Sequence, residues 1–411
     1  MTTELRVLER DQWDLFMGRL ERAFGGPQDS PERREGWRRV TEFERSLAVW
    51  DGAELVGTAG AFSFRMTVPG GALAEIPGVT MVSVQPTHRR RGVLTSMMRH
   101  QMDEFHQRGD AVAVLTASEP AIYGRFGYGV GSSQLAMSVD TGRVTIAGPP
   151  GADVDGVRMR VVSPADGREA CEAVYAAVVP SRPGMIARGP GWFEKLIADA
   201  PGDRDGAGEL LCVLAEVGGE VRGYARYSVT SEWDLRGPKG IVNLRDLEAL
   251  DPVTYAALWR YLAAIDLTST ISTYNRPVDD PLLHLVSDPR RCDQRVRDGL
   301  HVRVVDVGGA LESRTYTAPV DVVLDVEDAF CPWNAGRWRL TGDTKGASCT
   351  RTGDQPDLAL TVRELGAAFF GGFSLRAMGA AGLVRELRPG ALAEASTAFR
   401  VDVEPWLPHG F

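Results

Sequence analysis

The sequence predicts an α/β chain of three domains, of which the last is an α+β domain. Three observations indicate this fold class. Helical and strand patterns alternate through the first third, the same order of elements returns in the middle third, and from about Val302 the sequence is rich in strands and turns. The 411 residues suffice for several cores, and the Gly- and Pro-rich stretch at 148–153 marks a boundary. We predict domains at residues 1–149, 150–300 and 301–411.

The first domain is predicted to begin with helices and continue with strands. The segment Gly25-Gly26-Pro27 separates two helical patterns, and Asp51-Gly52-Ala53 is a hairpin signal between two strand patterns. The predicted elements, in order, are helices at 13–24 and 31–40, strands at 46–50, 54–64 and 80–84, a helix at 92–107 that stops before Gly109, a strand at 111–117 and a short helix around Tyr123.

The middle domain echoes the first. Residues 218–225 repeat the Gly, Glu, Gly and Ala spacing of residues 52–59, which predicts a second hairpin. The elements that follow are a strand at 241–247 and a helix at 252–265. Asp251 is the expected N-cap of this helix and Pro252 its first residue.

The last domain is predicted to be separate, with its own core. Its predicted elements are strands at 302–307, 320–326, 336–341, 347–351 and 358–362 and amphipathic helices at 362–370 and 375–380.

Residues 82–95 carry the most specific pattern in the chain. An apolar strand runs into Pro86, three arginines and Gly92, and a helical pattern follows. The start of a helix offers unpaired backbone N–H groups and a partial positive charge, Gly92 lets a ligand approach the backbone, and the arginines add full charges. This combination predicts a site for a phosphorylated cofactor. A P-loop would need Gly-Lys-Ser/Thr and a dinucleotide fold three glycines, and the bend has neither.

The basic run at 88–91 has a second interpretation, because such runs are more often solvated surface or nucleic-acid patches. The strand and Pro86 before it, Gly92 at the turn and the amphipathic segment after it favour the cofactor site. The formal net charge of -9 also opposes a polyanionic partner. We therefore expect no nucleic-acid partner.

Composition narrows the class of protein further. The five cysteines are dispersed and form no Cys-x-x-Cys, so we expect neither a metal site nor a disulfide framework, and a reducing compartment. The N-terminus lacks the apolar core of a signal peptide, and no stretch approaches 18 apolar residues. We expect a cytoplasmic protein that does not bind to membranes.

The spacing Arg89-x-x-Gly92-x-Leu94, entered from Val-x-Pro, resembles the pyrophosphate loop of the GCN5-related N-acetyltransferases (GNAT superfamily). The resemblance implies a catalytic GNAT domain that holds acetyl-CoA at this bend. The middle domain then resembles a degenerate GNAT copy, because Leu250-Asp251-Pro252 offers neither charge nor a flexible glycine, and we expect it to bind no CoA. Residues 336–340, 356–361 and 370–372 are similar to sterol carrier protein domains, for which lipid binding and a purely packing or oligomerising role remain equal alternatives.

Two GNAT-like domains, a sterol-carrier-like domain and the segment Ser-Glu-Pro-Ala-Ile-Tyr-Gly-Arg-Phe-Gly-Tyr-Gly at 118–129 together resemble the Eis (enhanced intracellular survival) family. This resemblance implies an N-acetyltransferase that uses acetyl-CoA. Its implied acceptors are amino groups of aminoglycosides or of lysine side chains, and its implied assembly is a homohexamer.

By the same resemblance, cofactor binding is expected along one strand, the bend and the end of the next strand. The expected residues are Val82, Ser83 and Val84, then Arg89, Arg90, Arg91, Gly92, Val93, Leu94 and Thr95, and finally Ser118 and Glu119. The pantetheine amides are expected to pair with a splayed strand edge while the diphosphate meets the helix N-terminus.

The chemistry needs a proton donor for the leaving thiolate, a donor to the developing oxyanion and a base for the ammonium. Tyr123 is the expected acid, with simple packing as the alternative, and the N–H of Val84 is an expected oxyanion donor. The resemblance implies that the terminal carboxylate of Phe411 is the base. An α-carboxyl has a reference pKa near 3.5, so desolvation or a water relay must assist it. His409 is a competing base, and a frayed tail is the ordinary fate of a terminus.

The sequence thus predicts an acetyl-CoA-dependent N-acetyltransferase acting on primary amines of small polycationic acceptors such as aminoglycosides, without a metal. Two alternatives remain, a protein lysine N-acetyltransferase and a non-enzymatic lipid- or CoA-binding scaffold. No acceptor-pocket residue is assigned, because aromatic residues such as Trp13, Phe24, Trp37 and Phe64 are more often core residues.

Overall fold

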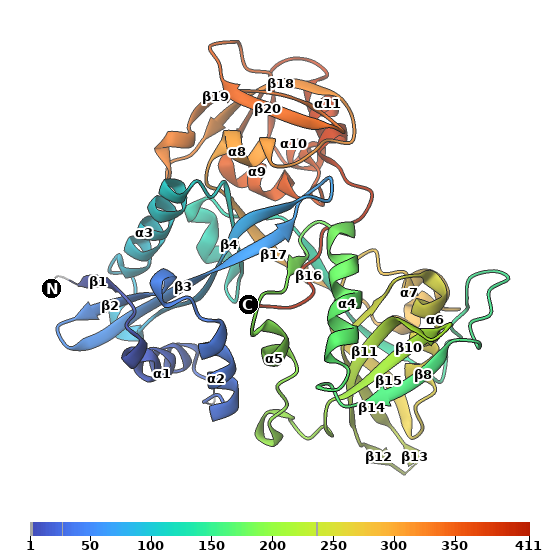
Figure 1. Cartoon of the computed structure of the whole chain (residues 1–411). Coiled ribbons are helices and arrows are strands. Elements are labelled where there is room, and N and C mark those ends of the chain that lie inside the picture. Colours follow the sequence, from blue (N-terminus) through green and yellow to red (C-terminus); the bar gives the residue numbers. More distant parts are fainter. Residues whose placement is uncertain (1–2, 27, 236) are drawn as a thin grey trace. The chain divides into compact units, whose positions relative to one another are not determined.

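The computed structural model describes residues 3–26, 28–235 and 237–411 (Figure 1). Within these residues the chain divides into two compact units. The first contains Met1–Ser133, Arg182–Ala187 and Asp298–Phe411, and the second contains Gln134–Ser181 and Arg188–Arg297. The predicted boundary after residue 149 lies inside the second unit. The division into two units does not test the three predicted domain ranges, which therefore stay a prediction. Pro27, part of the predicted break between the first two helices, lies outside the described residues.

The first unit begins with the predicted helices and strands. Its elements up to residue 130 are β1 (Glu4–Val7), η1 (Arg10–Gln12), α1 (Trp13–Phe24), α2 (Pro31–Val40), η2 (Phe43–Arg45), β2 (Leu47–Asp51), β3 (Glu54–Thr67), β4 (Leu73–Val84), η3 (Pro86–His88), α3 (Val93–Arg108), β5 (Val112–Thr116), η4 (Pro120–Phe126) and β6 (Gly129–Val130). The short strands β9 (Ile186–Ala187) and β17 (Leu300–Val304) join them, and the sheet order is β1-β2-β3-β4-β5-β17-β6 with β9 on β3.

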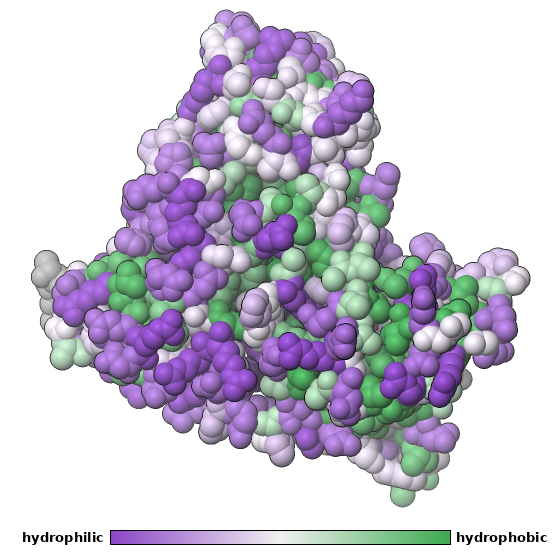
Figure 2. Space-filling model, in the orientation of Figure 1, coloured by the Kyte–Doolittle hydropathy of each residue, from purple (hydrophilic) through white to green (hydrophobic). Residues whose placement is uncertain are grey.

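Both early helices begin and end where the sequence indicates. Ser30 caps α2 by accepting a hydrogen bond from the Arg33 N–H, and Pro31 stands in its first turn. Gly25 ends α1 in the left-handed conformation. The helix α2 is rich in arginine and glutamate, and Figure 2 shows mostly hydrophilic side chains over α1 and α2.

The strand predicted at 302–307 does not belong to the last domain, to which the prediction assigned it. The structure has β17 at Leu300–Val304, antiparallel to both β5 and β6 in the first sheet, rather than in the last domain. All five of its residues are buried, which suits a strand with neighbours on both edges and cover on both faces. Apolar character alone does not reveal the partner strand, so the assignment to the following domain failed.

The second unit repeats the plan of a sheet with helices. Its elements are β7 (Ser133–Asp140), β8 (Arg158–Val162), α4 (Arg168–Val178), η5 (Val179–Ser181), α5 (Trp192–Leu196), η6 (Pro201–Asp203), β10 (Leu211–Val217), β11 (Glu220–Thr230), β12 (Trp233–Asp234), β13 (Gly237–Pro238), β14 (Gly240–Ala249), α6 (Pro252–Ala263), β15 (Thr268–Arg276), α7 (Leu282–Leu285), η7 (Pro289–Cys292) and β16 (Arg295–Asp298). Its main sheet has the order β16-β7-β15-β14-β11-β10-β8, and the predicted hairpin β10–β11 is present.

The last part of the chain forms a separate five-stranded sheet within the first unit. Its elements are α8 (Val307–Glu312), β18 (Val320–Glu327), η8 (Pro332–Asn334), β19 (Gly336–Asp343), β20 (Gly346–Arg351), β21 (Leu358–Thr361), α9 (Val362–Phe369), α10 (Leu375–Ala380), β22 (Arg385–Glu386) and α11 (Ala391–Phe399). The sheet order is β20-β19-β18-β21-β22. None of the helices in the described ranges combines the length and apolar character that a membrane-spanning helix needs.

Candidate functional site

The bend between β4 and α3 presents backbone amides to a concave surface. Arg90 and Gly92 both have positive φ angles, 61° and 85°, and Gly92 is the N-cap of α3. The first hydrogen bond of the helix runs from the Ser96 N–H to the Gly92 carbonyl at 2.9 Å. The amides of the preceding first turn therefore lie before the helical ladder, where an anion binds. Left-handed residues next to a helix start form a nest of N–H groups, which suits a phosphate.

Side chains of the basic run hold this bend in place. The His88 ring is 7% exposed, and its Nε2 lies 3.1 Å from Asp51 Oδ2 in the β2–β3 hairpin. The Arg89 guanidinium donates to the Val84 carbonyl at 3.4 Å and to the Ala23 carbonyl at 3.3 Å. The sequence grouped His88 with the arginines as one basic run, but its buried ring anchors the bend to the hairpin instead. No sequence signal paired it with Asp51.

Strands β4 and β5 separate just before the bend. Their parallel pairing covers Gly78 with Val114 and Val79 with Leu115. Beyond that point β4 continues to Val84 and β5 ends at Thr116. The sheet therefore opens on one side of β4, as the sequence interpretation expected for a strand edge that receives an extended ligand.

A β-bulge reshapes β4 at this opening. Thr58 of β3 faces Ser83 and Gly60 faces Thr80, so the single residue between them on β3 is opposite both Met81 and Val82. Met81 has a φ of 51°, which is uncommon for a residue with a side chain. Bulges of this kind re-aim backbone groups near functional sites. No sequence signal indicates this bulge, because methionine carries no preference for the left-handed region.

Two adjoining cavities occupy this opening. The first has a volume of about 640 Å³ and lies along the bend. It is lined by Ala23, Phe24, Val82, Ser83, Val84, His88, Arg89, Arg90, Gly92, Val93, Leu94, Thr95, Ser118, Glu119, Ile122, Tyr123 and Arg125. All residues predicted to bind the cofactor are in this set except Arg91, which is exposed at the surface outside it. The structure thus brings the other predicted residues together.

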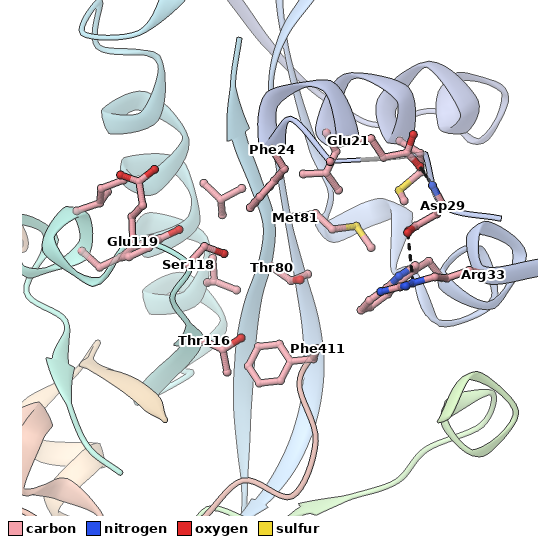
Figure 3. Close-up of a pocket in the computed structure, with 18 residues that line it drawn as sticks. Glu21, Phe24, Asp29, Arg33, Thr80, Met81, Thr116, Ser118, Glu119 and Phe411 are labelled. Atoms are coloured by element: carbon pink, nitrogen blue, oxygen red, sulfur yellow. Dashed lines mark hydrogen bonds and ion pairs between the residues drawn. The ribbon is translucent and has the colours of Figure 1, made fainter. Parts of the chain in front are cut away.

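The second cavity, of about 500 Å³, adjoins the first (Figure 3). It is lined by Met17, Leu20, Glu21, Phe24, Gly26, Asp29, Arg33, Trp37, Val79, Thr80, Met81, Val82, Thr116, Ser118, Glu119, Ile122, Tyr123 and Phe411. The residues shared by both linings are Phe24, Val82, Ser118, Glu119, Ile122 and Tyr123. A ligand in one cavity would therefore meet a ligand in the other beside Tyr123.

Tyr123 lies in η4 at the junction of the two cavities. Burial, together with the charge of Glu119, raises the pKa of the Tyr123 phenol to about 12. Its ring stands edge-on to Tyr128, with centroids 5.9 Å apart. The phenol consequently keeps its proton across the neutral range and is available as a proton donor.

A buried ion pair supports the turn that carries Tyr123. Arg303 donates to Asp328 at 2.7 Å, and both side chains are almost fully buried. Gly127, which ends η4, packs so closely that a Cβ there would be 2.7 Å from the Arg303 guanidinium. The sequence did not predict this support, because β17 was assigned to another sheet.

The C-terminal residue is docked in the second cavity. Phe411 is 9% exposed, and its ring packs against Phe64 with centroids 4.9 Å apart. Figure 3 shows it beside Thr116. His409, the competing base, does not belong to the lining of either cavity described here. The docking of this tail is the placement that the terminal-base hypothesis requires.

Acidic groups predominate among the charged residues of the second cavity. Glu21, Asp29 and Glu119 line it together with one cation, Arg33. Asp29 pairs with Arg33 at 3.3 Å, as Figure 3 shows, and Glu21 is paired with Arg34. Because these arginines offset two of the three carboxylates, the excess negative charge of the lining comes from Glu119, which favours a cationic group near Tyr123.

The four aromatic residues left unassigned by the sequence divide into two pairs. Phe24 and Trp37 line the second cavity, and the Trp37 ring stacks on Phe62 at 6.3 Å. Trp13 and Phe64 are 2% and 3% exposed and belong to the core.

The corresponding helix start in the second unit has a different chemistry. Asp251 caps α6 by accepting a hydrogen bond from the Thr254 N–H at 2.8 Å and also pairs with Arg222. Partial burial opposes ionisation of Asp251, but the hydrogen bonds from Thr254 outweigh it and lower its pKa. A carboxylate thus occupies the position where a phosphate would bind, which supports the prediction that this copy does not hold CoA.

Known protein families match three successive parts of the chain. Residues 4–131 and 184–304 each match an acetyltransferase (GNAT) domain family, and residues 307–408 match a sterol carrier protein domain family. These matches confirm the predicted fold class.

Similar proteins extend over nearly the whole length. An uncharacterized N-acetyltransferase of Streptomyces avermitilis is 62% identical over 411 residues, which is 100% of both chains. N-acetyltransferase Eis of Mycobacterium tuberculosis is 32% identical over 382 residues, 91% of both chains. The crystal structure of Eis1 from Mycobacterium abscessus is similar with a TM-score of 0.83 and 31% identity, and the match covers 100% of both chains.

Proposed function

Because the chain belongs to the Eis family of GNAT N-acetyltransferases, we propose that it acetylates primary amines of small polycationic acceptors such as aminoglycosides. GNAT acetyltransferases use acetyl-CoA as the acetyl donor. One observation carries the proposal: a cavity along the bend at the start of α3 adjoins a second cavity, with Tyr123 and Glu119 in both linings.

The bend is the proposed site of the CoA diphosphate. The amides of the first turn of α3 and the Arg90 side chain would hold the phosphates, while Arg89 keeps the bend in shape. The opened edge of β4, from Val82 to Val84, would pair with the pantetheine amides, and Ser118 and Glu119 would close the other side. Arg91 lies outside the linings of both cavities, so its role in cofactor binding rests on the sequence prediction alone.

The chain's own groups supply the remaining chemistry. In the proposed reaction the acceptor amine attacks the thioester carbon, and a backbone amide of β4, at Val84 or at the bulge of Met81 and Val82, donates to the oxygen that gains charge. Tyr123 protonates the departing sulfur. The Phe411 carboxylate takes the proton from the acceptor ammonium, directly or through water.

The acceptor class follows from the second cavity. The volume of about 500 Å³ and the excess negative charge at Glu119 suit a small cationic amine better than an extended protein loop, so protein lysine acetylation is the second candidate. A scaffold that merely binds lipid or CoA would not need Tyr123 and the docked Phe411 together in the lining of one cavity. We further propose, from the family resemblance, a homohexamer in the cytoplasm.

Turnover with a panel of amines tests this function. We expect the protein to release CoA, detected as free thiol, with aminoglycosides and polyamines, and to be slower with lysine-containing peptides. Preference for the peptides would support the protein lysine acetyltransferase. No thiol release with any amine, despite calorimetric binding of CoA, would support the binding protein instead.

Replacing Arg90 with alanine tests the bend. A charge-assisted hydrogen bond contributes about 1.5–3 kcal/mol, so we expect R90A to weaken CoA binding roughly 10- to 100-fold in calorimetry. The matched control is R143A, which removes an exposed arginine in the second unit. Equal affinities of R90A and the unchanged protein would contradict the proposed diphosphate site.

A further inference from the structure

The segment Arg182–Ala187 belongs to the first unit, although the chain on both sides of it belongs to the second. It is attached to the end of β3: the Gly184 N–H donates to the Thr67 carbonyl at 2.8 Å, and the Thr67 N–H donates to the Met185 carbonyl at 2.9 Å. Met185 and Ile186 are 2% and 1% exposed. The segment is therefore a firmly held extra edge on β3.

This segment is hydrogen-bonded to the backbone of the C-terminal tail. The Trp406 N–H donates to the Pro183 carbonyl at 2.9 Å, and the Arg182 guanidinium donates to the Glu404 carbonyl at 2.5 Å. Directly after Pro183, Gly184 has a φ of +90°, and a Cβ there would be 3.0 Å from the Trp406 carbonyl oxygen. Only glycine permits both the conformation and the approach of the tail.

These hydrogen bonds to the tail lie a few residues before the proposed base, Phe411. Trp406 and Leu407 are 3% and 5% exposed, and the chain then reaches Phe411, whose ring packs on Phe64 and near Gly78. A carboxylate at the end of a tail has no side chain to orient it, so its position depends on where the backbone is fixed. Catalytic groups must be held closely, because a displacement of about 1 Å costs up to roughly 100-fold in rate.

We propose that Arg182, Pro183 and Gly184 form a clamp that positions the terminal carboxylate of Phe411 in the acceptor cavity. The inference rests on the proposed role of that carboxylate and adds positioning residues to it. None of the three residues belongs to the lining of either cavity described above, so the proposed effect on catalysis runs through the tail.

Gly184→Ala in the full chain tests the clamp. We expect kcat to fall by up to roughly 100-fold with an unchanged KM for acetyl-CoA, because the donor cavity is untouched. We also expect carboxypeptidase to release Phe411 faster, as followed by intact mass. Gly218→Ala is the matched control, since Gly218 is also left-handed but has open space around it. Arg182→Met is a second variant, and Arg182→Lys should restore part of the loss.

A double variant separates the clamp from general destabilisation. In a chain ligated to end in Phe411 amide, which has no terminal carboxylate, Gly184→Ala should cause no additional loss of kcat, because both changes act on one group. An equal loss in that background, or unchanged release of Phe411 in Gly184→Ala, would overturn the clamp. Full activity of the amide chain would instead refute the terminal base, and the rate of Phe411 release from the free-acid chain would still decide whether the clamp holds the tail.

Discussion

Tyr123→Phe is expected to lower kcat by roughly 100- to 1,000-fold while CoA binding stays unchanged, because positioned general acids contribute on this scale. The substitution removes only the hydroxyl, so the ring keeps its edge-on packing against Tyr128. A stopped thiol assay gives kcat, and calorimetry with CoA gives the affinity. Tyr128→Phe is the matched control, since Tyr128 is 1% exposed and lines neither cavity described above.

The pH dependence distinguishes an acid from a packing residue. Because burial and Glu119 raise the pKa of Tyr123 to about 12, the phenol stays protonated and competent until the pH approaches that value. We therefore expect no loss of kcat from Tyr123 between pH 7 and pH 10. A Tyr123→Phe enzyme with unchanged kcat would assign Tyr123 to packing, the alternative that the sequence left open.

The regular elements of this fold were largely predictable because local signals coincide with periodicity. Helix α2 has Ser30 and Pro31 at its start, and α1 ends at Gly25. The predicted strand at 80–84 is confirmed only as the end of β4, which begins at Leu73. Pro77, a residue type that is disfavoured inside paired strands, lies within β4 opposite Ser63.

Contacts between distant segments were not predictable from one sequence. The place of β17 in the first sheet, the pairing of His88 with Asp51 and the attachment of residues 182–187 to β3 all depend on tertiary packing. The candidate site was easier to predict from the sequence, because its bend combines a strand end, Pro86, arginines and Gly92 over a few residues. The carboxylates of the second cavity come from α1 (Glu21), the segment before α2 (Asp29) and the start of η4 (Glu119), and no local pattern joins these.

Blocking the carboxylate of Phe411 should have an effect as large as the loss of Tyr123. A protein ligated to end in Phe411 amide keeps the ring that packs on Phe64 but has no carboxylate, so docking and proton acceptance are separated. We expect kcat to fall roughly 100- to 10,000-fold, the range of general acid–base catalysis. The control is the same ligation product with a free acid, which should equal the recombinant enzyme.

The pH profile of the two ligation products carries the decisive comparison. A terminal base must lose its proton before it accepts one, so the free-acid product should gain activity as pH rises through the pKa of that carboxylate or of the acceptor ammonium, whichever limits the rate. With the amide, raising the pH supplies free amine from solution and should restore part of the lost rate. If the amide product instead equals the free acid at neutral pH, the proton leaves by another route, and His409 or water becomes the candidate.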